Sequence, residues 1–525
     1  MGNMGAATSV TGATRGAPHR HGQHPHRWAV LAVLSVSLLV VSLDTTILNV
    51  ALPTIVRDLK ASSAQLQWIV DAYSVVFAGL LLLVGTLGDR VGRKWVFMAG
   101  LAVFAAGSAA SAWSSSPGML TAFRASMGVG GAAVMPSTLS ILTNVFDDDE
   151  RATAIGIWSG TTGLGVAVGP VIGGWLLAHY WWGSVFLINV PIAAAGLLAS
   201  AWLVPNSKNL SSKAPDPVGG ALSVAGMGLL LWGIIEAPNR SWTSSLVLGA
   251  LVGSAVVLGA FVVWEKRSTH PMLELSFFSA PRFSAAVSSM GIVMFALMGG
   301  LFVLTQYLQF SLGYSAFAAG LRIAPVAGVL LVTAPLSTPL VRLLGTKAVV
   351  CTGLGVIAAG MLLVSSTTVH GDYTDALPAF ILIGAGTGLA MPSCTDSVMG
   401  SVPPELAGAG SATNGAFLQT GGALGVAILG SLLNSRYKGH LDPLLHGYAV
   451  PANVLHTING SLGGALAVAQ QVGGAVGAGL AGAARQGFVL GMDLSSETAG
   501  YVVIGAAVLV VAFLPSRGRA PRAGK

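Results

Sequence analysis

Blocks of about 20 apolar residues recur along almost the whole chain, and they limit what it can fold into more than any other feature. Each block is long enough to cross a hydrocarbon core of about 30 Å as a helix. Charged residues make up only 9% of the chain, which is roughly a third of their usual share in soluble domains. Because so few charges cannot cover a water-exposed surface, the sequence predicts an all-α integral membrane protein.

Polar, proline and glycine breaks divide the apolar blocks into 14 predicted membrane spans. Basic residues favour the cytoplasmic side of a membrane. With the N-terminus inside, 18 Lys and Arg fall in inside segments and six in outside segments. This asymmetry predicts a multi-pass protein of the cytoplasmic (inner) membrane with both termini in the cytoplasm. The predicted spans are 28–52, 66–87, 95–112, 118–142, 153–178, 183–204, 218–236, 245–264, 282–311, 317–340, 347–366, 376–398, 406–434 and 495–515.

The chain resembles itself at a spacing of about 255 residues. The Met-Pro-Ser element at 135–137 recurs at 391–393, and Gly92 recurs as Gly345. Ordered matches at nearly one offset indicate a duplication of a six-helix unit. Duplicated units that meet around a site in the middle of the membrane are how many secondary transporters alternate access. The repeat therefore favours a transporter.

The duplication also predicts the order of the domains. Within the second bundle, the apolar segment 461–484 is expected to lie outside or on the membrane surface, because one more span would break the charge asymmetry. The expected parts are a disordered cytoplasmic tail over 1–27, an N-terminal six-helix bundle over 28–204, a linker with two extra transmembrane helices over 205–281, a C-terminal six-helix bundle over 282–515 that contains a long external loop at 435–494, and a basic cytoplasmic tail over 516–525.

The segment GTLGDRVGRK at 85–94 joins the second and third predicted spans. Its glycines permit a tight turn and a close approach of two helices, and Asp89 is expected to cap a helix N-terminus of the other bundle. The basic residues are expected to pair with acids at helix ends, such as the run at 147–150. We interpret the segment as a latch that closes the cytoplasmic side, whereas a plain basic loop would not need this glycine spacing. The latch residues are Gly85, Asp89, Arg90, Gly92, Arg93 and Lys94.

These residues resemble a known family. The segment 85–94 resembles the signature between helices 2 and 3 of the major facilitator superfamily. Three other segments resemble motifs in the first, fourth and fifth helices of its 14-helix drug:proton antiporters, and they lie at 43–55, 123–137 and 160–174. The resemblance implies a major facilitator fold of two six-helix bundles with two inserted helices. Within that family, the sequence is most similar to the actinobacterial multidrug and antibiotic exporters.

This resemblance also implies a function. Such a protein exchanges an inward proton for an outward small lipophilic drug or antibiotic, works as a monomer in the lipid bilayer and needs no cofactor beyond the proton gradient. A proton-coupled symporter or a facilitator for a small metabolite on the same fold is the alternative.

The fifth-helix motif is rich in small residues. Gly165, Gly169, Gly173 and Gly174 remove side chains along one side of the helix and permit close packing. Pro170 interrupts the backbone ladder and kinks the helix. The resemblance implies that this helix seals the two bundles against leakage, which favours antiport. Small-residue packing alone is the alternative, and it explains the glycines better than it explains the GPxxGG pattern at 169–174.

Ionisable residues inside the predicted spans are candidates for the coupling site, because each costs about 2.5–3.5 kcal/mol in the middle of a bilayer. Asp44 and Arg124 belong to motifs that line the central cavity in the family, and the resemblance implies that proton and substrate compete through them. A static ion pair is the alternative. Asp71 is a second candidate for the proton or for a cationic drug, unless it only lies near the outer interface. Asp396 follows the repeated element, and its role stays open, while Arg322 lies close enough to a span end to snorkel.

Flexible and aromatic side chains in the central spans are candidates for contact with the substrate, because such side chains adapt to varied ligands. For each of them ordinary packing is the alternative. They are Met135, Met294, Met298, Phe302, Tyr307 and Met391.

Several classes of function are disfavoured by the composition. The net charge of +7 does not form a patch for nucleic acid, because Lys and Arg stand singly between apolar blocks. Cys351 and Cys394 fall inside apolar segments, which argues against a disulfide or a cysteine metal site. The sequence carries no metal-ligand set, phosphate-binding loop or nucleophile motif. We therefore expect neither a metal site nor an enzyme.

Overall fold

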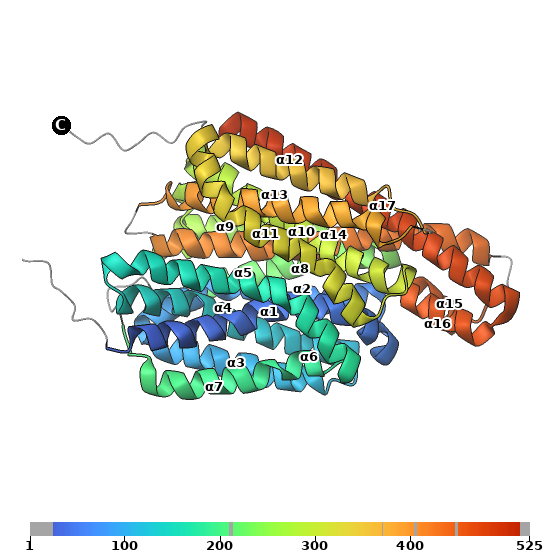
Figure 1. Ribbon diagram of the computed structural model, residues 1–525, viewed down its shortest axis with the longest axis horizontal. Helices are drawn as coiled ribbons and strands as arrows, with labels where there is room; N and C mark the ends of the chain where they lie inside the picture. Colours follow the sequence, from blue (N-terminus) through green and yellow to red (C-terminus); the bar gives the residue numbers. More distant parts are fainter. Residues whose placement is uncertain (1–24, 209–213, 370, 404–406, 447–449, 515–525) are drawn as a thin grey trace, which may run out of the picture.

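The computed structural model describes residues 25–208, 214–369, 371–403, 407–446 and 450–514. Over these ranges the chain is helical, with no strand. The long helices run side by side along the longest axis of the molecule (Figure 1). The predicted tails, apart from residues 25–27, fall outside the described residues.

Seven helices form the first half of the chain. Local sequence sets their ends: Ser62 and Gln65 form a reciprocal capping box at the start of α2, and Ser116 caps α4. Between α2 and α3, Gly92 has a φ of 131°, which reverses the chain in a conformation that favours glycine. The helices are α1 (Arg27–Leu59), α2 (Ser63–Val91), α3 (Arg93–Ala112), α4 (Pro117–Val145), α5 (Asp148–His179), α6 (Ser184–Leu187) and α7 (Asn189–Leu203).

Two inserted helices follow, α8 (Pro217–Arg240) and α9 (Ser245–Arg267), and then a short 3₁₀ turn, η1 (Leu275–Ser279). Helix α8 packs against α2 of the first half and α14 of the second, whereas α9 packs mainly against α8. The pair therefore lies beside the junction of the two halves rather than within either one.

The second half contains eight helices and one π-helical turn. Gly345 (φ 85°) separates α11 from α12 as Gly92 separates α2 from α3. The elements are α10 (Pro281–Gln306), η2 (Tyr307–Ser311), α11 (Ala316–Leu344), α12 (Thr346–Val364), α13 (Tyr373–Met399), α14 (Ala407–Leu445), α15 (Ala452–Gly460), α16 (Leu462–Val472) and α17 (Gly474–Phe513).

The number of membrane-crossing helices agrees with the sequence. Thirteen helices among the described residues are long and apolar enough to cross a bilayer, with α6 and α7 counted as one span. The remaining predicted span, 153–178, falls within α5, which is 32 residues long and packs along α1 and α11, and of which Val168–His179 forms a shorter apolar stretch. The chain is a multi-pass membrane protein.

The internal repeat appears as matching helix contacts. In the first half Gly130 of α4 lies against the backbone of Gly100 in α3. In the second half Gly386 of α13 lies against the backbone of Gly353 in α12 in the same way. Any side chain at these glycines would push the paired helices apart. The repeated glycines are therefore packing positions of a duplicated bundle.

The segment 435–494 differs from the long loop that the sequence predicts, because most of its described residues are helical. Helix α14 has 39 residues and α17 has 40, so each is about 60 Å long, twice the thickness of a hydrocarbon core. The shorter α15 and α16 lie between them at one end of the molecule (Figure 1, right). The side of the membrane on which this end lies stays a prediction.

The apolar part of this region, 461–484, does not form a separate membrane span. It is divided between α16, which has 11 residues, and the start of α17. Gly473 and Gly474 break it with φ angles of 63° and 59°. This agrees with the expectation that no further span lies here.

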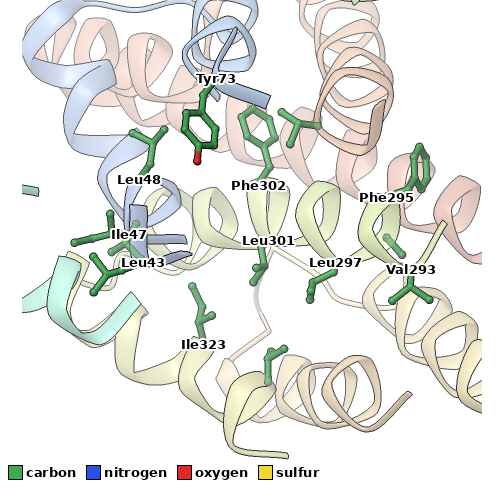
Figure 2. Packing of buried hydrophobic residues seen from close by; sticks show 14 of the residues in the cluster. Leu43, Ile47, Leu48, Tyr73, Val293, Phe295, Leu297, Leu301, Phe302 and Ile323 are labelled. Carbon is green, nitrogen blue, oxygen red and sulfur yellow. The ribbon is translucent and has the colours of Figure 1, made fainter. Parts of the chain in front are cut away.

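The core is shared between the halves. Leu43 and Ile47 of α1 and Tyr73 of α2 lie in the same buried cluster as Leu301 of α10 and Ile323 of α11 (Figure 2). Apolar packing alone is not directional. Polar and glycine contacts must therefore decide how the halves are arranged around the site described next.

Candidate functional site

A buried ion pair lies in the first half. Asp44 of α1 is 0% exposed and Arg124 of α4 is 1% exposed, and Nη1 of Arg124 donates to Oδ2 of Asp44. The Nε of Arg124 donates to the backbone oxygen of Ile69 in α2 at 3.1 Å. Its guanidinium also lies over the ring of Tyr73, 4.5 Å from the centroid. Three helices therefore hold one charged pair away from water.

Asn189, at the start of α7, completes the surroundings of Asp44. Its Nδ2 donates to Oδ1 of Asp44 at 3.2 Å and to Oγ of Ser108 at 3.1 Å, and Ser108 in turn donates to the backbone oxygen of Phe186 at 2.8 Å. Asn189 is not among the site residues predicted from the sequence. An amide inside the apolar segment 183–204 was the available signal, because buried polar groups need partners.

The polar stretch around Asp44 is compatible with an apolar helix because its hydroxyls bond within the helix. Thr45 donates to the backbone oxygen of Ser42 at 2.7 Å, and Thr46 donates to that of Leu43 at 3.3 Å. Such bonds to the preceding turn satisfy a buried hydroxyl without a tertiary partner. Thr46 also reaches the backbone oxygen of Gly165 in α5 at 3.5 Å, whereas the Asp44 carboxylate accepts its hydrogen bonds from α4 and α7.

A cavity of about 170 Å³ lies next to the pair. Its walls come from α1, α2 and α4 of the first half and from α10, α13 and α14 of the second. The lining residues are Leu38, Val41, Ser42, Thr45, Asn49, Val70, Tyr73, Ser74, Phe77, Arg124, Met135, Met294, Met298, Met391, Gly415, Leu418, Gln419, Gly422 and Val426.

Four of the candidate lining residues from the sequence lie on this wall, namely the four methionines. Two others do not, which corrects the prediction. Phe302 is 2% exposed and packs in the core with Tyr73 (Figure 2). Tyr307 lies in the π-helical turn, where its hydroxyl donates to the backbone oxygen of Thr368 at 3.1 Å. Neither ring lines the cavity, although Phe302 lies where α10 of the second half meets α2 of the first.

Asp71 lies apart from the ion pair. It is 0% exposed, does not line the cavity, and neither of its carboxylate oxygens has a hydrogen-bond partner among the described residues. Gln67, one turn earlier, accepts from Ser431 of α14 at 3.5 Å. Val75, one turn later, belongs to an apolar cluster with residues of α8 and α14. Because positions four apart share a helix face, Asp71 lies on the side of α2 that meets α8 and α14.

Asp396 and Arg322 are not part of the site. Asp396 is exposed near the end of α13 and is not on the cavity wall. It therefore lies apart from Asp44 and Arg124, the other predicted candidates for the coupling site. Arg322 lies 3.8 Å from the ring centroid of Tyr314 and 5.4 Å from that of Tyr373. It is held between two aromatic rings instead of snorkelling to a span end.

Comparison with known proteins decides the family. Residues 34–426 match the model of the Major Facilitator Superfamily. The chain belongs to the Major Facilitator Superfamily. It is therefore a transporter rather than an enzyme.

Two curated relatives and one solved structure place it more closely. The chain is 35% identical to the tetracenomycin C resistance and export protein of Streptomyces glaucescens over 78% of this chain and 76% of that one. It is also 35% identical to a multidrug efflux pump of Mycolicibacterium smegmatis, over 84% and 87% of the two chains. The fold resembles that of a bacterial homologue of the lysosomal transporter Spinster, with a TM-score of 0.68 and 18% identity over 95% of this chain and all of that one.

The superfamily signature at 85–94 makes its contacts within the first half. Nε of Arg93 pairs with Oδ1 of Asp89 at 2.7 Å, its Nη1 donates to the backbone oxygen of Ser140 at 3.2 Å, and Nζ of Lys94 donates to that of Ala201 at 2.8 Å. The described partners of Asp89 are thus not in the other bundle, which corrects that prediction. The reason is local, since Arg93 follows Asp89 by four residues at the helix junction.

The acidic run at 147–150 also differs from the expectation. Glu150 pairs with Arg27 at 2.6 Å, and not with the basic residues of the signature. Hydrogen bonding to Arg27, at the cytoplasmic end expected from the sequence, lowers the pKa of the Glu150 carboxyl. The side chains of Asp148 and Asp149 lie outside the described residues, and Arg90 is exposed. A Cβ added at Gly85 would lie 3.5 Å from Cβ of Pro136, an ordinary van der Waals contact, so the approach of α2 to α4 at this point does not require glycine.

The glycines of α5 pack onto α1 on either side of Asp44. A Cβ at Gly165 would lie 2.7 Å from Cβ of Ser42, one at Gly169 would overlap Oγ1 of Thr46, and one at Gly173 would lie 2.6 Å from Cγ1 of Ile47. These contacts leave no room for larger side chains. Helix α5 therefore fixes the part of α1 that carries Asp44.

The same helix meets the other half on an adjacent face. A Cβ at Gly174 would lie 2.7 Å from the backbone oxygen of Ala316 in α11, and the backbone of Pro170 touches Gly320. The antiporter motif thus lies between the helix of the ion pair and the second bundle.

The halves of this superfamily member are joined at the end opposite the signature 85–94. There Nε2 of Gln309 donates to the backbone oxygen of Val50 at 2.9 Å, Ser431 reaches Gln67 at 3.5 Å, and Arg57 lies 5.7 Å from the ring centroid of Phe310. At the signature end, the side-chain hydrogen bonds between described residues stay within one half. The cavity is therefore separated by polar contacts from the end at which α1 terminates.

Proposed function

We propose that this transporter exports drugs or antibiotics across the cytoplasmic membrane in exchange for protons. The observation that carries this proposal is the buried Asp44–Arg124 pair, whose arginine lines a cavity shared by both halves. The names of the two curated relatives, one a resistance and export protein and one an efflux pump, support the direction and the class of substrate. The chain works as a monomer and without a cofactor.

A proton and a substrate both act on the same pair. Protonation of Asp44 removes the charge that neutralises Arg124, whereas a substrate in the cavity contacts Arg124 directly. A ligand drives a conformational change only through different affinities for the two states. Because the pair is buried, the loss of one charge changes its free energy by several kcal/mol, which is enough to bias the alternation.

Asp71 is the second candidate for a proton site. A carboxylate buried without a partner is costly, and in this conformation Asp71 has no partner among the described residues. A protonated carboxyl avoids that cost. Movement of α14 away from α2 would expose Asp71, so its proton exchange is tied to the opening of the end at which Gln67 meets Ser431.

The test is transport in proteoliposomes with an imposed pH gradient, using Nile red as the substrate. We expect substrate movement against its gradient that an uncoupler abolishes. Asp44→Asn removes this driven movement but retains substrate exchange in the absence of a gradient, which shows that the variant is folded. Asp396→Asn, a change at an exposed acid away from the cavity, serves as the control and leaves both activities intact. Full driven transport by Asp44→Asn would refute the assignment.

Proton movement distinguishes the antiporter from a symporter on the same fold. Substrate is added to de-energised vesicles in weak buffer, and the external pH is recorded. An antiporter moves protons against the direction of the substrate, whereas a symporter moves them with it. The α5 glycines and Pro170 between the halves favour the antiporter, because a sealed seam prevents an uncoupled leak.

A further inference from the structure

The cavity wall carries almost no charge. Of its 19 described residues, Arg124 alone is charged, and that charge is positive. Asp44, which neutralises it, is 0% exposed and does not line the wall. Asp71 lies on a different face of α2. A molecule in the cavity therefore meets the cationic side of the ion pair and no carboxylate from the described residues.

A permanent cation has no counter-charge in such a cavity. Taking a cation out of water is costly unless an anion pairs with it. Aromatic faces are the usual substitute, and the wall offers Tyr73 and Phe77. The ring of Tyr73 is already covered by the guanidinium of Arg124, 4.5 Å from its centroid. One remaining ring does not form a cation cage.

The polar groups of the wall are suited to an uncharged molecule. Arg124 offers N–H donors on one side, and Asn49 of α1 contributes an amide whose buried Oδ1 has no hydrogen-bond partner among the described residues. Gln419 of α14 offers a further amide from the opposite half. Carbonyl and hydroxyl groups match this set, because one accepts from Arg124 and the other donates to Asn49.

The apolar part of the wall favours aromatic rings. Four methionines line it, one from α4, two from α10 and one from α13. Methionine sulfur makes favourable contacts with aromatic rings and its flexible side chain adapts to their shape. Phe77 adds a ring that stacks with another.

We propose that the cavity selects uncharged aromatic molecules that carry carbonyl or hydroxyl groups, and that it discriminates against permanent cations. This rests on the export function proposed above and names its substrate class. The selectivity comes from the arrangement of one ion pair, in which the carboxylate is behind the guanidinium rather than beside the ligand.

The test compares two probes of similar size and different charge, triphenylphosphine oxide, which is neutral with one strong acceptor oxygen, and tetraphenylphosphonium, which is a permanent cation. Purified protein in lipid nanodiscs binds Nile red, an uncharged aromatic dye with a carbonyl group, and each probe is titrated as a competitor. We expect triphenylphosphine oxide to displace the dye at a concentration at least tenfold lower than tetraphenylphosphonium. Equal or tighter binding of the cation, or no binding of Nile red, overturns the proposal.

A gain of function gives a second test. Gln419→Glu places a carboxylate on the wall, and we expect it to strengthen tetraphenylphosphonium binding at least tenfold while leaving triphenylphosphine oxide within about threefold. Gln419→Met is the matched control, and we expect it not to shift the preference between the two probes towards tetraphenylphosphonium. Asn49→Asp repeats the test from the other half, so a folding defect in one variant does not decide the outcome. Unchanged cation binding in both acidic variants overturns the proposal.

Transport separates this inference from the export function. If vesicles with a pH gradient export tetraphenylphosphonium but not Nile red, the export function stands and the selectivity proposal is overturned. If Nile red binds with the expected preference but no probe is moved by the gradient, the selectivity is supported and the export function is refuted.

Discussion

Neutralising both members of the buried pair should restore part of the stability that is lost when one is removed. Arg124→Gln leaves the carboxylate of Asp44 buried without its cation. Removing one partner of a buried pair costs about 3–5 kcal/mol. The single change also removes the hydrogen bond to Ile69 and the contact with Tyr73, which are worth about 1–2 kcal/mol together.

The double variant Asp44→Asn, Arg124→Gln removes the isolated charge but not those two lost contacts. We therefore expect it to recover at least about 2 kcal/mol of the 3–5 kcal/mol. The remaining deficit is the loss of the contacts with Ile69 and Tyr73. Neither variant is expected to carry out proton-driven transport, because the pair that is proposed to couple proton and substrate is broken in both.

The assay is a double-mutant cycle on purified protein, with the unfolding free energy measured by denaturant titration in a mild detergent. The single Asp44→Asn variant completes the cycle, since it leaves Arg124 as an unpaired buried cation. The coupling energy isolates the pair from its neighbours. If the double variant is no more stable than Arg124→Gln, the pair is not a buried ion pair in the folded protein, and the proposed competition of proton and substrate at this site is wrong.

Other predictions address the contacts around the site. Gly169→Ala brings a Cβ onto Thr46 and should cost about 1–3 kcal/mol of stability. The control Gly156→Ala, where nothing lies within 4 Å of the added Cβ, should be neutral or stabilising by up to about 1 kcal/mol. Equal melting temperatures of the two variants would contradict the close packing of Gly169. Asn189→Ala removes a bond to Asp44 and should cost about 1–3 kcal/mol by denaturant titration, and no loss would mean that this amide does not support the carboxylate. Gln309→Leu removes a hydrogen bond between the halves worth about 0.5–1.5 kcal/mol. A cysteine introduced on the cavity wall should therefore be labelled about 2- to 12-fold faster from the end opposite the signature 85–94. Unchanged labelling would show that this bond does not hold that end closed.

Features set by hydrophobic periodicity were predictable from the sequence. The number of membrane helices and the duplicated halves follow from apolar segment length and from repeated glycines such as Gly130 and Gly386, because these depend on the lipid and on neighbouring helices close in the chain. Asp44 and Arg124 were also identifiable, since a charge inside an apolar span needs a partner.

Features that depend on distant partners were not predictable. Phe302 and Met298 lie one turn apart on α10, yet only Met298 reaches the cavity, because the position of α14 decides which part of that face remains open. Asn189 resembles any polar residue near a span end until α7 is placed beside α1. The helices of 435–494 were hidden by frequent glycines, which lower helix propensity but do not prevent α17 from packing against α14.

The position of Asp44 along α1 links the site to the closed end of the cavity. Val50, whose backbone oxygen holds Gln309 of the other half, follows Asp44 by six residues, a distance of about 9 Å along the helix. Helix α5 packs against the same stretch of α1 and reaches α11 through the adjacent positions Pro170 and Gly174. Under the proposed mechanism, neutralising Asp44 breaks the ion pair that joins Arg124 of α4 to α1, the helix that also carries Val50. We therefore expect a proton at Asp44 to act on the closure of the cavity through α1 itself.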